Sequence, residues 1–375
     1  MKKPEILFLI TSLQSGGIEN YLLRFLQFYG VEGCTCFCAL NIGGALEEKY
    51  RRLGVNLVFQ RFSYVNPFTW IPFMTYLQRH KPDIICDFRG DFAAVALTIA
   101  RLCGVRYRIC WYRHSSHLFT PHWWNLAYSF VCNRLIRWNG CRILSNSEAA
   151  LDFYHPYWRK RPGRFRVIRN GISKDWVWKG TREESRDALH LPQEAFVIGH
   201  TGNFRPPKNH KTILAVAIEL CRRHSRIHFV LCGKNVPENC ASAVEQAGLT
   251  GQIHLFSHIP DVNRMLKALD IFYFPSVTEG QPNALIEAMV SNIPVCSSNI
   301  AAIGECVPAE IRPDLLPPQD VDAAVKYLEE CCLHPEKMDR LRCGEWAARA
   351  YDAEKCFLQF QEELFLPEEA SSKIC

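Results

Sequence analysis

The sequence lacks a hydrophobic run long enough to span a membrane. None of the apolar stretches in its 375 residues reaches the roughly 18 residues that a transmembrane helix needs. We also expect no secretory leader, because residues 1–5 lead directly into a short apolar stretch. From these two absences we expect a cytoplasmic protein.

The cysteines lack the paired C-x-x-C spacing of many zinc and redox sites. Eighteen cysteines can also indicate a disulfide scaffold, but such scaffolds are short secreted chains. Cys34, Cys36 and Cys38 alternate along the chain, so they share one face of a predicted strand. We interpret them as small buried apolar residues, with a metal site as the alternative. The cysteines therefore favour a reducing compartment.

Acidic residues are scarce in one long stretch. Residues 101–170 contain thirteen Lys or Arg and only two Asp or Glu, whereas the whole chain has a formal net charge of +6. Such asymmetry indicates an anionic partner. A membrane surface, a phosphorylated acceptor and nucleic acid are the three candidates.

Length and composition predict two α/β domains. A chain of this length exceeds what one core usually supports, and 48% hydrophobic with 22% charged residues is typical of a globular protein. Strand-like and helix-like segments alternate, which predicts a parallel sheet with helices on both faces. The predicted strands are Ile6–Ile10, Thr35–Leu40, Asn56–Phe59, Asp83–Cys86 and Tyr107–Cys110, and the predicted helices are Ala45–Leu53, Pro67–Arg79 and Ala93–Cys103.

Two glycines follow the first predicted strand, where a helix begins. Gly16 and Gly17 allow the backbone to approach a ligand closely, and the helix start offers N–H groups to an anion. A tight turn is the alternative. The segment does not match G-x-G-x-x-G, which argues against a Rossmann dehydrogenase.

Residues 275–290 are the most informative stretch. They follow the apolar segment Ile271–Phe274, which predicts a buried strand. A turn with Gly280 and Pro282 then leads into a predicted helix. We expect Asn283 to cap this helix, whose first turn and dipole make a site for an anion such as phosphate.

Two carboxylates accompany this turn. Glu279 precedes the helix and can reach a ligand over the turn, while Glu287 lies about one turn inside it and can accept hydrogen bonds from a diol. Two solvated carboxylates on an ordinary strand–turn–helix are the alternative. The whole pattern, up to the predicted strand Pro294–Ser297, resembles the nucleotide-sugar site of retaining glycosyltransferases, in particular glycosyltransferase family 4 with its two-domain GT-B fold.

The resemblance covers nearly the whole chain, from Ile6 to about Phe365. Gly-Gly-Ile-Glu at residues 16–19 looks like the family's first loop, whose glycine backbone meets the donor diphosphate. Phe165–Ile172 resembles the last strand of the first domain and its Asn-Gly-Ile connection. The resemblance implies two Rossmann-like domains facing a central cleft. These are residues 1–171 on the acceptor side, joined by a returning helix at about 350–366, and residues 172–349 on the nucleotide-sugar side.

The resemblance also implies the donor residues. In the loop Asn203–His210, relatives carry an Arg and a Lys that neutralise the departing diphosphate. Lys208 matches the lysine, Asn203 stands where many relatives have the arginine, and Arg205 is expected to supply the missing charge. A solvated loop is the alternative. The other expected donor residues are Glu279 at the sugar, Glu287 at the ribose hydroxyls, and Gly16, Gly17, Ile259, Gly280, Pro282, Asn283 and Ala284.

A loop rich in Arg and His follows the predicted strand Tyr107–Cys110. In the family, a histidine in this region lies near the transferred sugar, and His114 is the candidate. Arg113 or His117 can instead align with the family's histidine. Alternatively, His114 is an ordinary surface histidine. Residues 118–138 then combine aromatics with arginines, which suits either a membrane interface or lipid-linked acceptor or an aromatic core helix.

A metal signature is present only nominally. Asp320-Val321-Asp322 satisfies D-x-D, but it directly precedes a predicted helix at Ala323–Glu330. We expect it to cap that helix, and we expect no essential metal or other cofactor.

The resemblance implies a retaining enzyme that moves a sugar from a UDP-, GDP- or ADP-sugar to a glycan or lipid-linked acceptor. We expect it in polysaccharide or glycolipid assembly at the cytosolic face of a membrane, with residues 101–170 toward an anionic surface and no nucleic-acid partner. One alternative is a sugar-nucleotide epimerase on the same fold. The other is a non-catalytic module that binds anionic lipid or nucleic acid.

Overall fold

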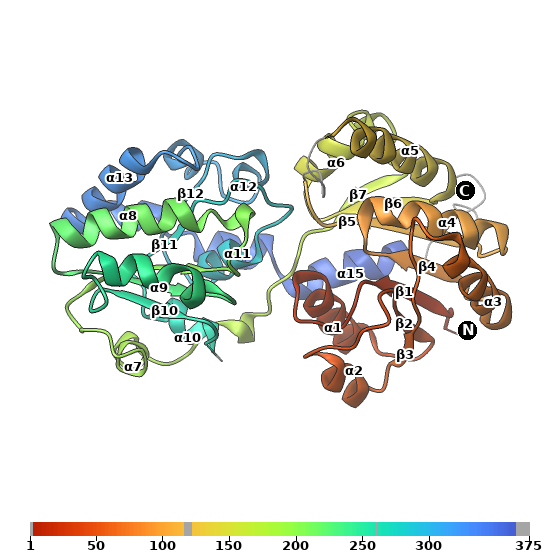
Figure 1. Ribbon diagram of the computed structural model, residues 1–375, viewed down its shortest axis with the longest axis horizontal. Coiled ribbons are helices and arrows are strands. Elements are labelled where there is room, and N and C mark those ends of the chain that lie inside the picture. The colour runs from red at the N-terminus through yellow and green to blue at the C-terminus, as the bar shows by residue number, and fades with distance from the viewer. Residues whose placement is uncertain (1–2, 116–121, 260, 365–375) are drawn as a thin grey trace. The chain divides into compact units, whose positions relative to one another are not determined.

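A computed structural model of the chain describes residues 3–115, 122–259 and 261–364. Internal contacts divide the chain into two compact units (Figure 1). The first unit comprises Met1–Asn170 with Glu354–Cys375, and the second comprises Gly171–Ala353. Each is built on a parallel sheet with helices packed against it.

The first unit contains a seven-stranded parallel sheet in the order β3-β2-β1-β4-β5-β6-β7. Leu7 of β1 pairs with Thr35 of β2 on one side and with Ile85 of β4 on the other. The strand order therefore reverses between β1 and β4. The strands are β1 Ile6–Ile10, β2 Cys34–Cys38, β3 Asn56–Phe59, β4 Ile84–Asp87, β5 Tyr107–Tyr112, β6 Arg142–Ser145 and β7 Phe165–Val167.

Helices cover both faces of this sheet. One face packs Leu9 and Phe37 against buried residues of α3, α4, α5 and α6. The other face carries Phe8, whose ring lies 6.3 Å from that of Phe25 in α1. The helices are α1 Gly17–Tyr29, α2 Glu47–Leu53, α3 Trp70–His80, α4 Ala93–Leu102, α5 Trp123–Asn139 and α6 Glu148–Tyr154.

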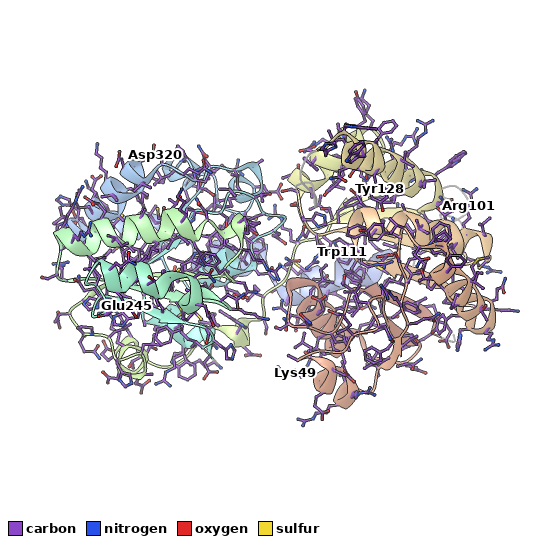
Figure 2. The ribbon with its side chains drawn as sticks, viewed as in Figure 1. Lys49, Arg101, Trp111, Tyr128, Glu245 and Asp320 are labelled. Carbon is purple, nitrogen blue, oxygen red and sulfur yellow. The ribbon has the colours of Figure 1, made fainter. Side chains whose placement is uncertain are left out.

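The last helix, α15 (Ala353–Leu364), packs on the first unit. The ring of Phe360 lies 4.4 Å from the rings of both Phe25 and Trp111, and Trp111 is fully buried (Figure 2). Glu363 forms an ion pair with Arg142 at 2.8 Å. The predicted return of the terminal helix to the first domain is confirmed, although its expected end at 365–366 lies outside the described residues.

The second unit contains a five-stranded parallel sheet in the order β10-β9-β8-β11-β12. Because β9 and β10 lie on one side of β8 and β11 and β12 on the other, the direction of winding reverses between β8 and β11. The strands are β8 Phe196–Thr201, β9 Ile227–Cys232, β10 Ile253–Phe256, β11 Ile271–Phe274 and β12 Val295–Ser297, and the helices are α7 Arg182–Ala188, α8 His210–Arg223, α9 Val236–Gln246, α10 Val262–Lys267, α11 Asn283–Val290, α12 Ala301–Gly304, α13 Val321–Leu333 and α14 Gly344–Ala350.

The strands are apolar on both faces because helices cover both faces. Phe196 and Ile198 belong to one core of the second unit, whereas Val197 between them belongs to the other. Successive strand residues point to opposite faces, so a strand covered on both sides needs a continuous apolar run. This confirms the physical basis of the strand predictions.

Several predicted elements have different bounds in the structure, and two of these differences have a clear local cause. The strand expected at Thr35–Leu40 spans Cys34–Cys38 and stops before Asn41, which has a left-handed φ of 57°. The helix expected at Pro67–Arg79 begins as a short 3-10 turn, Pro67–Thr69, whose start is capped by the side chain of Asn66.

The predicted role of the alternating cysteines is confirmed. Cys34, Cys36 and Cys38 are buried free thiols in β2, and burial raises the pKa of the Cys34 thiol to about 12. No group of three His, Cys, Asp or Glu side chains that could hold a metal ion occurs among the described residues.

By sequence, residues 118–138 are interpreted either as a membrane or acceptor surface or as an aromatic core helix. Helix α5, which begins at Trp123, tests the core-helix interpretation. Its buried side chains are Cys132, Ile136 and Asn139, whereas its aromatics Trp123, Trp124, Phe130 and Trp138 are exposed. The core-helix interpretation is therefore wrong for α5, and residues 118–121 lie outside the described range. Among the described helices, none combines the length and hydropathy that crossing a bilayer requires.

Candidate functional site

The carboxyl ends of β8 and β11 carry the donor-side candidates of the second unit. In doubly wound sheets, ligands bind outside the carboxyl ends of the strands, where the winding reverses. The loop after β8 contains Asn203, Arg205 and Lys208, and the loop after β11 contains Glu279 and Gly280. The fold therefore brings two separated segments together at one edge.

Lys208 and Glu279 form an ion pair across these loops. The Lys208 Nζ donates to Glu279 Oε1 at 2.7 Å, and the two side chains are only 23% and 12% exposed. The ammonium also lies 4.6 Å from the ring centroid of Phe274, at the end of β11. A cation is thus held at the point of reversal, with a carboxylate fixing its position.

The two loops are also joined through their backbones. Val277 N donates to Pro207 O at 2.9 Å. The side-chain amide of Asn209 donates to Pro275 O at 3.1 Å and to Pro318 O at 2.6 Å, while Asn209 itself adopts a left-handed φ of 58°. These bonds hold the Lys208 loop rigidly against the Glu279 loop, which favours a preformed site.

The start of α11 differs from the prediction. Pro282 O accepts the first helical hydrogen bond, from Ile286 N at 3.1 Å, so Pro282 occupies the capping position and Asn283 is already inside the helix. The prediction that Asn283 caps α11 is wrong, because the extended backbone of Pro282 (ψ 95°) moves the boundary by one residue. Ala284 and Glu287 lie half-buried on this helix.

Asn203 has a structural contact in this unit. Its Oδ1 accepts a hydrogen bond from Lys234 N at 3.1 Å, which ties the loop after β8 to the loop after β9. Arg205 precedes the 3-10 turn Pro206–Lys208 and is exposed. A cation at 205 is therefore accessible, while the amide at 203 organises the loop.

The side chain of Ile259 is buried in the core of the second unit. It is 9% exposed and belongs to a core cluster of the second unit with Met265. Nearby, Arg264 donates to Glu184 O at 2.9 Å, so this arginine joins α10 to α7. A base contact near Ile259 stays a prediction.

His200 is a residue that the sequence pattern did not single out. It is fully buried in β8, its Nδ1 lies 3.0 Å from Tyr273 O, and burial holds the pKa of its imidazole well below the ordinary value. A Cβ on Gly202 would lie 2.9 Å from His200 Nε2 and 3.3 Å from Lys208 Cδ. Gly202 thus packs between the neutral imidazole of His200 and the aliphatic part of Lys208. The only sequence signal for this arrangement was a histidine within an apolar strand.

In the first unit, the candidates also lie at the carboxyl edge of the sheet. Gly16 precedes α1 in an extended conformation and Gly17 is its first residue. His114 follows β5 and packs on Gly90, which follows β4 with a left-handed φ of 59°. A Cβ on Gly90 would lie 3.3 Å from the His114 ring, so glycine makes room for this imidazole.

His114 is mostly buried and neutral at physiological pH. Burial lowers the pKa of its imidazole to about 4, and its Nε2 has no hydrogen-bond partner within the described part of the chain. Such a group can hydrogen-bond a hydroxyl without carrying charge. Asp91, next to Gly90, is a further buried group that was not predicted, and burial raises the pKa of its carboxyl to about 6.

Arg113, the first alternative to His114, packs against aromatic rings of the core. Its guanidinium lies 4.4 Å from the Tyr21 ring centroid and 5.3 Å from that of Trp111, against the core beneath α1. The other alternative, His117, lies outside the described residues. His114 therefore stays the candidate of this loop.

The D-x-D segment is a helix cap. Asp320 Oδ1 accepts a hydrogen bond from Ala323 N at 2.9 Å, and α13 follows directly (Figure 2). The predicted capping role of Asp320 is confirmed.

Two family models match the chain. The model for glycosyl transferases group 1 matches residues 181–345, and the model for Glycosyltransferase Family 4 matches residues 15–176. The two matches fall in the second and first units respectively and together span most of the sequence.

Curated relatives agree with these matches. The chain is 28% identical over 218 residues to the putative glycosyltransferase EpsF of Bacillus subtilis (strain 168), covering 57% of this chain and 56% of that protein. It is 28% identical over 273 residues to the UDP-Gal:alpha-D-GlcNAc-diphosphoundecaprenol alpha-1,3-galactosyltransferase of Escherichia coli, covering 67% of each. The chain spans only 56% of the length of EpsF, 36% of the Vi polysaccharide biosynthesis protein VipC/TviE of Salmonella typhi and 48% of the D-inositol 3-phosphate glycosyltransferase of Saccharomonospora viridis.

Solved structures show the same fold over nearly the full chain. Anabaena Alr3699/HepE in complex with UDP and glucose superposes with a TM-score of 0.81 at 17% identity, covering 96% of this chain and 99% of that one. WaaG, a glycosyltransferase involved in lipopolysaccharide biosynthesis, gives 0.70 at 14% identity, covering 95% and 98%. The chain therefore belongs to glycosyltransferase family 4 and has the two-domain GT-B fold.

Proposed function

We propose that this protein is a retaining glycosyltransferase that moves a sugar from a nucleoside-diphosphate sugar to a glycan or lipid-linked acceptor. The observation that carries the proposal is the Lys208–Glu279 pair at the winding reversal of the second unit. Family membership supports it, as do the names of two relatives: one uses UDP-Gal, and one was solved with UDP and glucose.

The chemistry follows from where charge develops. When the sugar–phosphate bond breaks, negative charge grows on the departing diphosphate. A fixed cation stabilises that charge without reorganising during the reaction, and Lys208, held by Glu279, meets this requirement. The exposed Arg205 adds a second cation, and the start of α11 adds its dipole.

The carboxylates have separate roles in this proposal. Glu279 positions Lys208 and accepts hydrogen bonds from the transferred sugar. Glu287, about one turn inside α11, accepts hydrogen bonds from the ribose hydroxyls. We assign no covalent nucleophile. With two cations at the diphosphate, we expect turnover without an added divalent metal, which an assay in EDTA tests.

The first unit contributes the acceptor side. The buried, neutral His114 presents an imidazole nitrogen to a sugar hydroxyl, and the glycine backbone at residues 16–17 allows close approach of a phosphate. The exposed aromatics of α5, together with the basic stretch 101–170, fit peripheral contact with an anionic membrane at its cytosolic face.

The proposal is tested by turnover of labelled nucleotide sugars. A thermal-shift panel of UDP-, GDP- and ADP-sugars first identifies the donor, since a ligand that binds only the folded protein raises its Tm. Release or transfer of the labelled sugar is then measured for Lys208→Ala and for Lys211→Ala, an exposed lysine of α8 that serves as control. We expect Lys208→Ala to lower turnover by about 10²–10³-fold and the control to leave it unchanged. Equal turnover in both variants would rule out the assigned site.

A further inference from the structure

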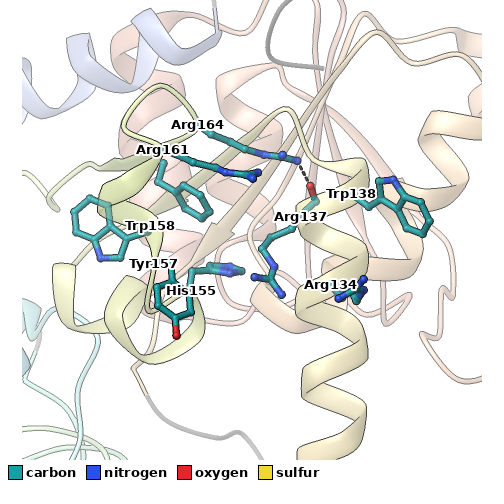
Figure 3. A pocket seen from close by; sticks show the side chains of 9 residues that line it. Arg134, Arg137, Trp138, His155, Tyr157, Trp158, Arg161 and Arg164 are labelled. Carbon is teal, nitrogen blue, oxygen red and sulfur yellow. Dashed lines mark hydrogen bonds between the residues drawn. The ribbon is translucent and has the colours of Figure 1, made fainter.

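The first unit contains an arginine-lined pocket that the proposed transfer reaction does not use. Its volume is about 470 Å³, within the roughly 300–1,000 Å³ of small-molecule sites. Arg134 and Arg137 reach it from the end of α5, and Arg161 and Arg164 from the segment before β7 (Figure 3). His155 lines its centre.

This pocket lies at the opposite edge of the sheet from the candidate catalytic residues. Helix α5 ends just before β6 begins, and Arg164 immediately precedes Phe165, the first residue of β7. The pocket is thus at the amino ends of β6 and β7, whereas His114 follows the carboxyl end of β5. Because all strands of this sheet are parallel, the arginines and His114 belong to opposite ends of the strands. The aromatic rings of Tyr112 and Tyr154 lie between the two places, since the Tyr112 ring is 5.2 Å from His155 and the Tyr154 ring is 5.8 Å from His114.

The positive charge of the pocket is not neutralised by neighbouring carboxylates. Among the described residues, none of the four arginines forms an ion pair with Asp or Glu. Arg159, in the same segment, differs: it pairs with both Glu148 and Asp152. Arg164 donates to the backbone carbonyls of Arg137 and Gly140, so its guanidinium is fixed in place but its charge is uncompensated.

His155 is a buried polar group without a protein partner. It is 2% exposed, and neither ring nitrogen has a hydrogen-bond partner in the described part of the chain. Burial and the nearby charges of Arg137 and Arg164 lower the pKa of its imidazole to about 3. Buried polar atoms are nearly always paired in native proteins, so two unpaired nitrogens indicate that a ligand or water belongs here.

We propose that this pocket binds a phosphate-bearing anion, either a diphosphate or a phosphomonoester. Guanidinium groups bind phosphate oxygens in a bidentate manner, and several of them converge here from two segments (Figure 3). The imidazole of His155 supplies a further hydrogen-bond donor. The inference does not depend on the proposed transferase activity, because all of its residues lie in the first unit and none belongs to the donor site.

The aromatic rim leaves two sources for such a phosphate. Tyr157 and Trp138 are highly exposed beside the arginines. They can stack on the base or sugar of a soluble phosphorylated metabolite, or they can lie at the level of lipid headgroups. The shared chemistry is the phosphate group, and the experiment separates its sources.

Calorimetric titration with inorganic pyrophosphate tests the site directly. The full chain carries Arg205→Ala and Lys208→Ala throughout, so that the donor site does not contribute. We expect binding to persist in this background and to weaken at least ten-fold when Arg137→Ala and Arg161→Ala are added. Both of these side chains are exposed, so their loss leaves the core intact. Arg159→Ala, the matched control, should change the affinity by less than two-fold.

Vesicle binding then distinguishes the sources. Phosphatidylcholine vesicles with and without phosphatidate are sedimented with the same variants. Loss of phosphatidate-dependent binding in Arg137→Ala/Arg161→Ala supports a lipid headgroup in the pocket, and retained vesicle binding with lost pyrophosphate binding supports a soluble ligand. If neither pyrophosphate nor phosphatidate binding responds to the double variant while Arg159→Ala behaves identically, the proposal is overturned.

Discussion

At the scale of single residues, the account depends on one ion pair and the groups that support it. Lys208 and Glu279 come from loops about 70 positions apart in sequence, and they meet because β8 and β11 are neighbours. The two side chains are only 23% and 12% exposed, and removing one partner of a largely buried pair costs more stability than breaking an exposed pair. We therefore propose that the pair both joins the two loops and positions the charge of Lys208.

Replacing Glu279 by Gln should separate these two contributions. The neutral amide no longer fixes the Lys208 ammonium, so we expect kcat to fall by about 10²-fold. Because the Lys208 charge loses its partner in a largely buried place, we expect the free energy of unfolding to fall by about 1–3 kcal/mol. Steady-state kinetics and urea denaturation measure the two effects. A large loss of stability with unchanged kcat would show that the pair is structural.

His114 should make the protein sensitive to mild acid. Its pKa is about 4 in the folded protein against 6.5 for an unperturbed histidine, so the unfolded chain binds the proton more readily. Stability conferred by the neutral form is complete above pH 6.5 and is lost as the pH falls toward 4, by up to about 3 kcal/mol. Unfolding of the wild type and of His114→Gln across this range should show a steeper loss for the wild type; parallel curves would contradict the burial of this imidazole.

At the scale of elements, some features were predictable from sequence and others were not. The strands Ile6–Ile10, Asn56–Phe59 and Ile271–Phe274 have the predicted bounds, because burial on both faces imposes a continuous apolar run. The cap of α11 was mispredicted because it depends on the backbone angles of Pro282, which the residue type alone does not determine.

Burial was the harder property to predict. The aromatics of α5 gather on one half of the helix at helical spacing, and a core-facing helix and an exposed interfacial helix share such a pattern, so it did not distinguish the two. His200 went unnoticed for the same reason: a histidine within an apolar strand shows neither its burial nor its contact with Tyr273. The ion pair between residues 208 and 279 depends on tertiary structure, and only the family resemblance placed both residues in one site.

Gly202 should be intolerant of a side chain at the end of β8. A methyl group there would lie 2.9 Å from His200 Nε2 and 3.3 Å from Lys208 Cδ, so the His200 ring must shift and the Lys208 side chain must give way slightly. We expect Gly202→Ala to raise KM for the donor and to destabilise the protein by about 1–3 kcal/mol. Gly251→Ala, where a Cβ meets nothing within 4 Å, is the control. Equal kinetics for both variants would show that the Lys208 position is not critical.

Helix α5 should bring the first unit to anionic membranes. Trp123 and Phe130 are 67% and 62% exposed and lie on the same side of the helix, seven residues apart. We expect Trp123→Ala/Phe130→Ala to reduce sedimentation with phosphatidylglycerol vesicles several-fold, whereas Leu333→Ala, an exposed apolar residue of the second unit, should have no effect. Undiminished sedimentation of the α5 variant would contradict membrane contact through this helix.

At the scale of the whole molecule, each unit carries its own set of candidate residues. Each places them at the carboxyl edge of its own sheet, as doubly wound folds do. In the reaction that we propose, the second unit provides the cations and carboxylates for a nucleotide sugar. The first provides a neutral histidine, a glycine loop and, at its other edge, the arginine pocket. Two family matches, one to each unit, follow the same division.

The most direct test of the central claim is a crystal structure with the nucleoside diphosphate that gives the largest thermal shift among UDP, GDP and ADP. We predict that the diphosphate lies within hydrogen-bonding distance of Lys208 Nζ, beside the first turn of α11, with the ribose against Glu287. A well-ordered nucleotide bound elsewhere, with Lys208 still paired only to Glu279, would contradict the account.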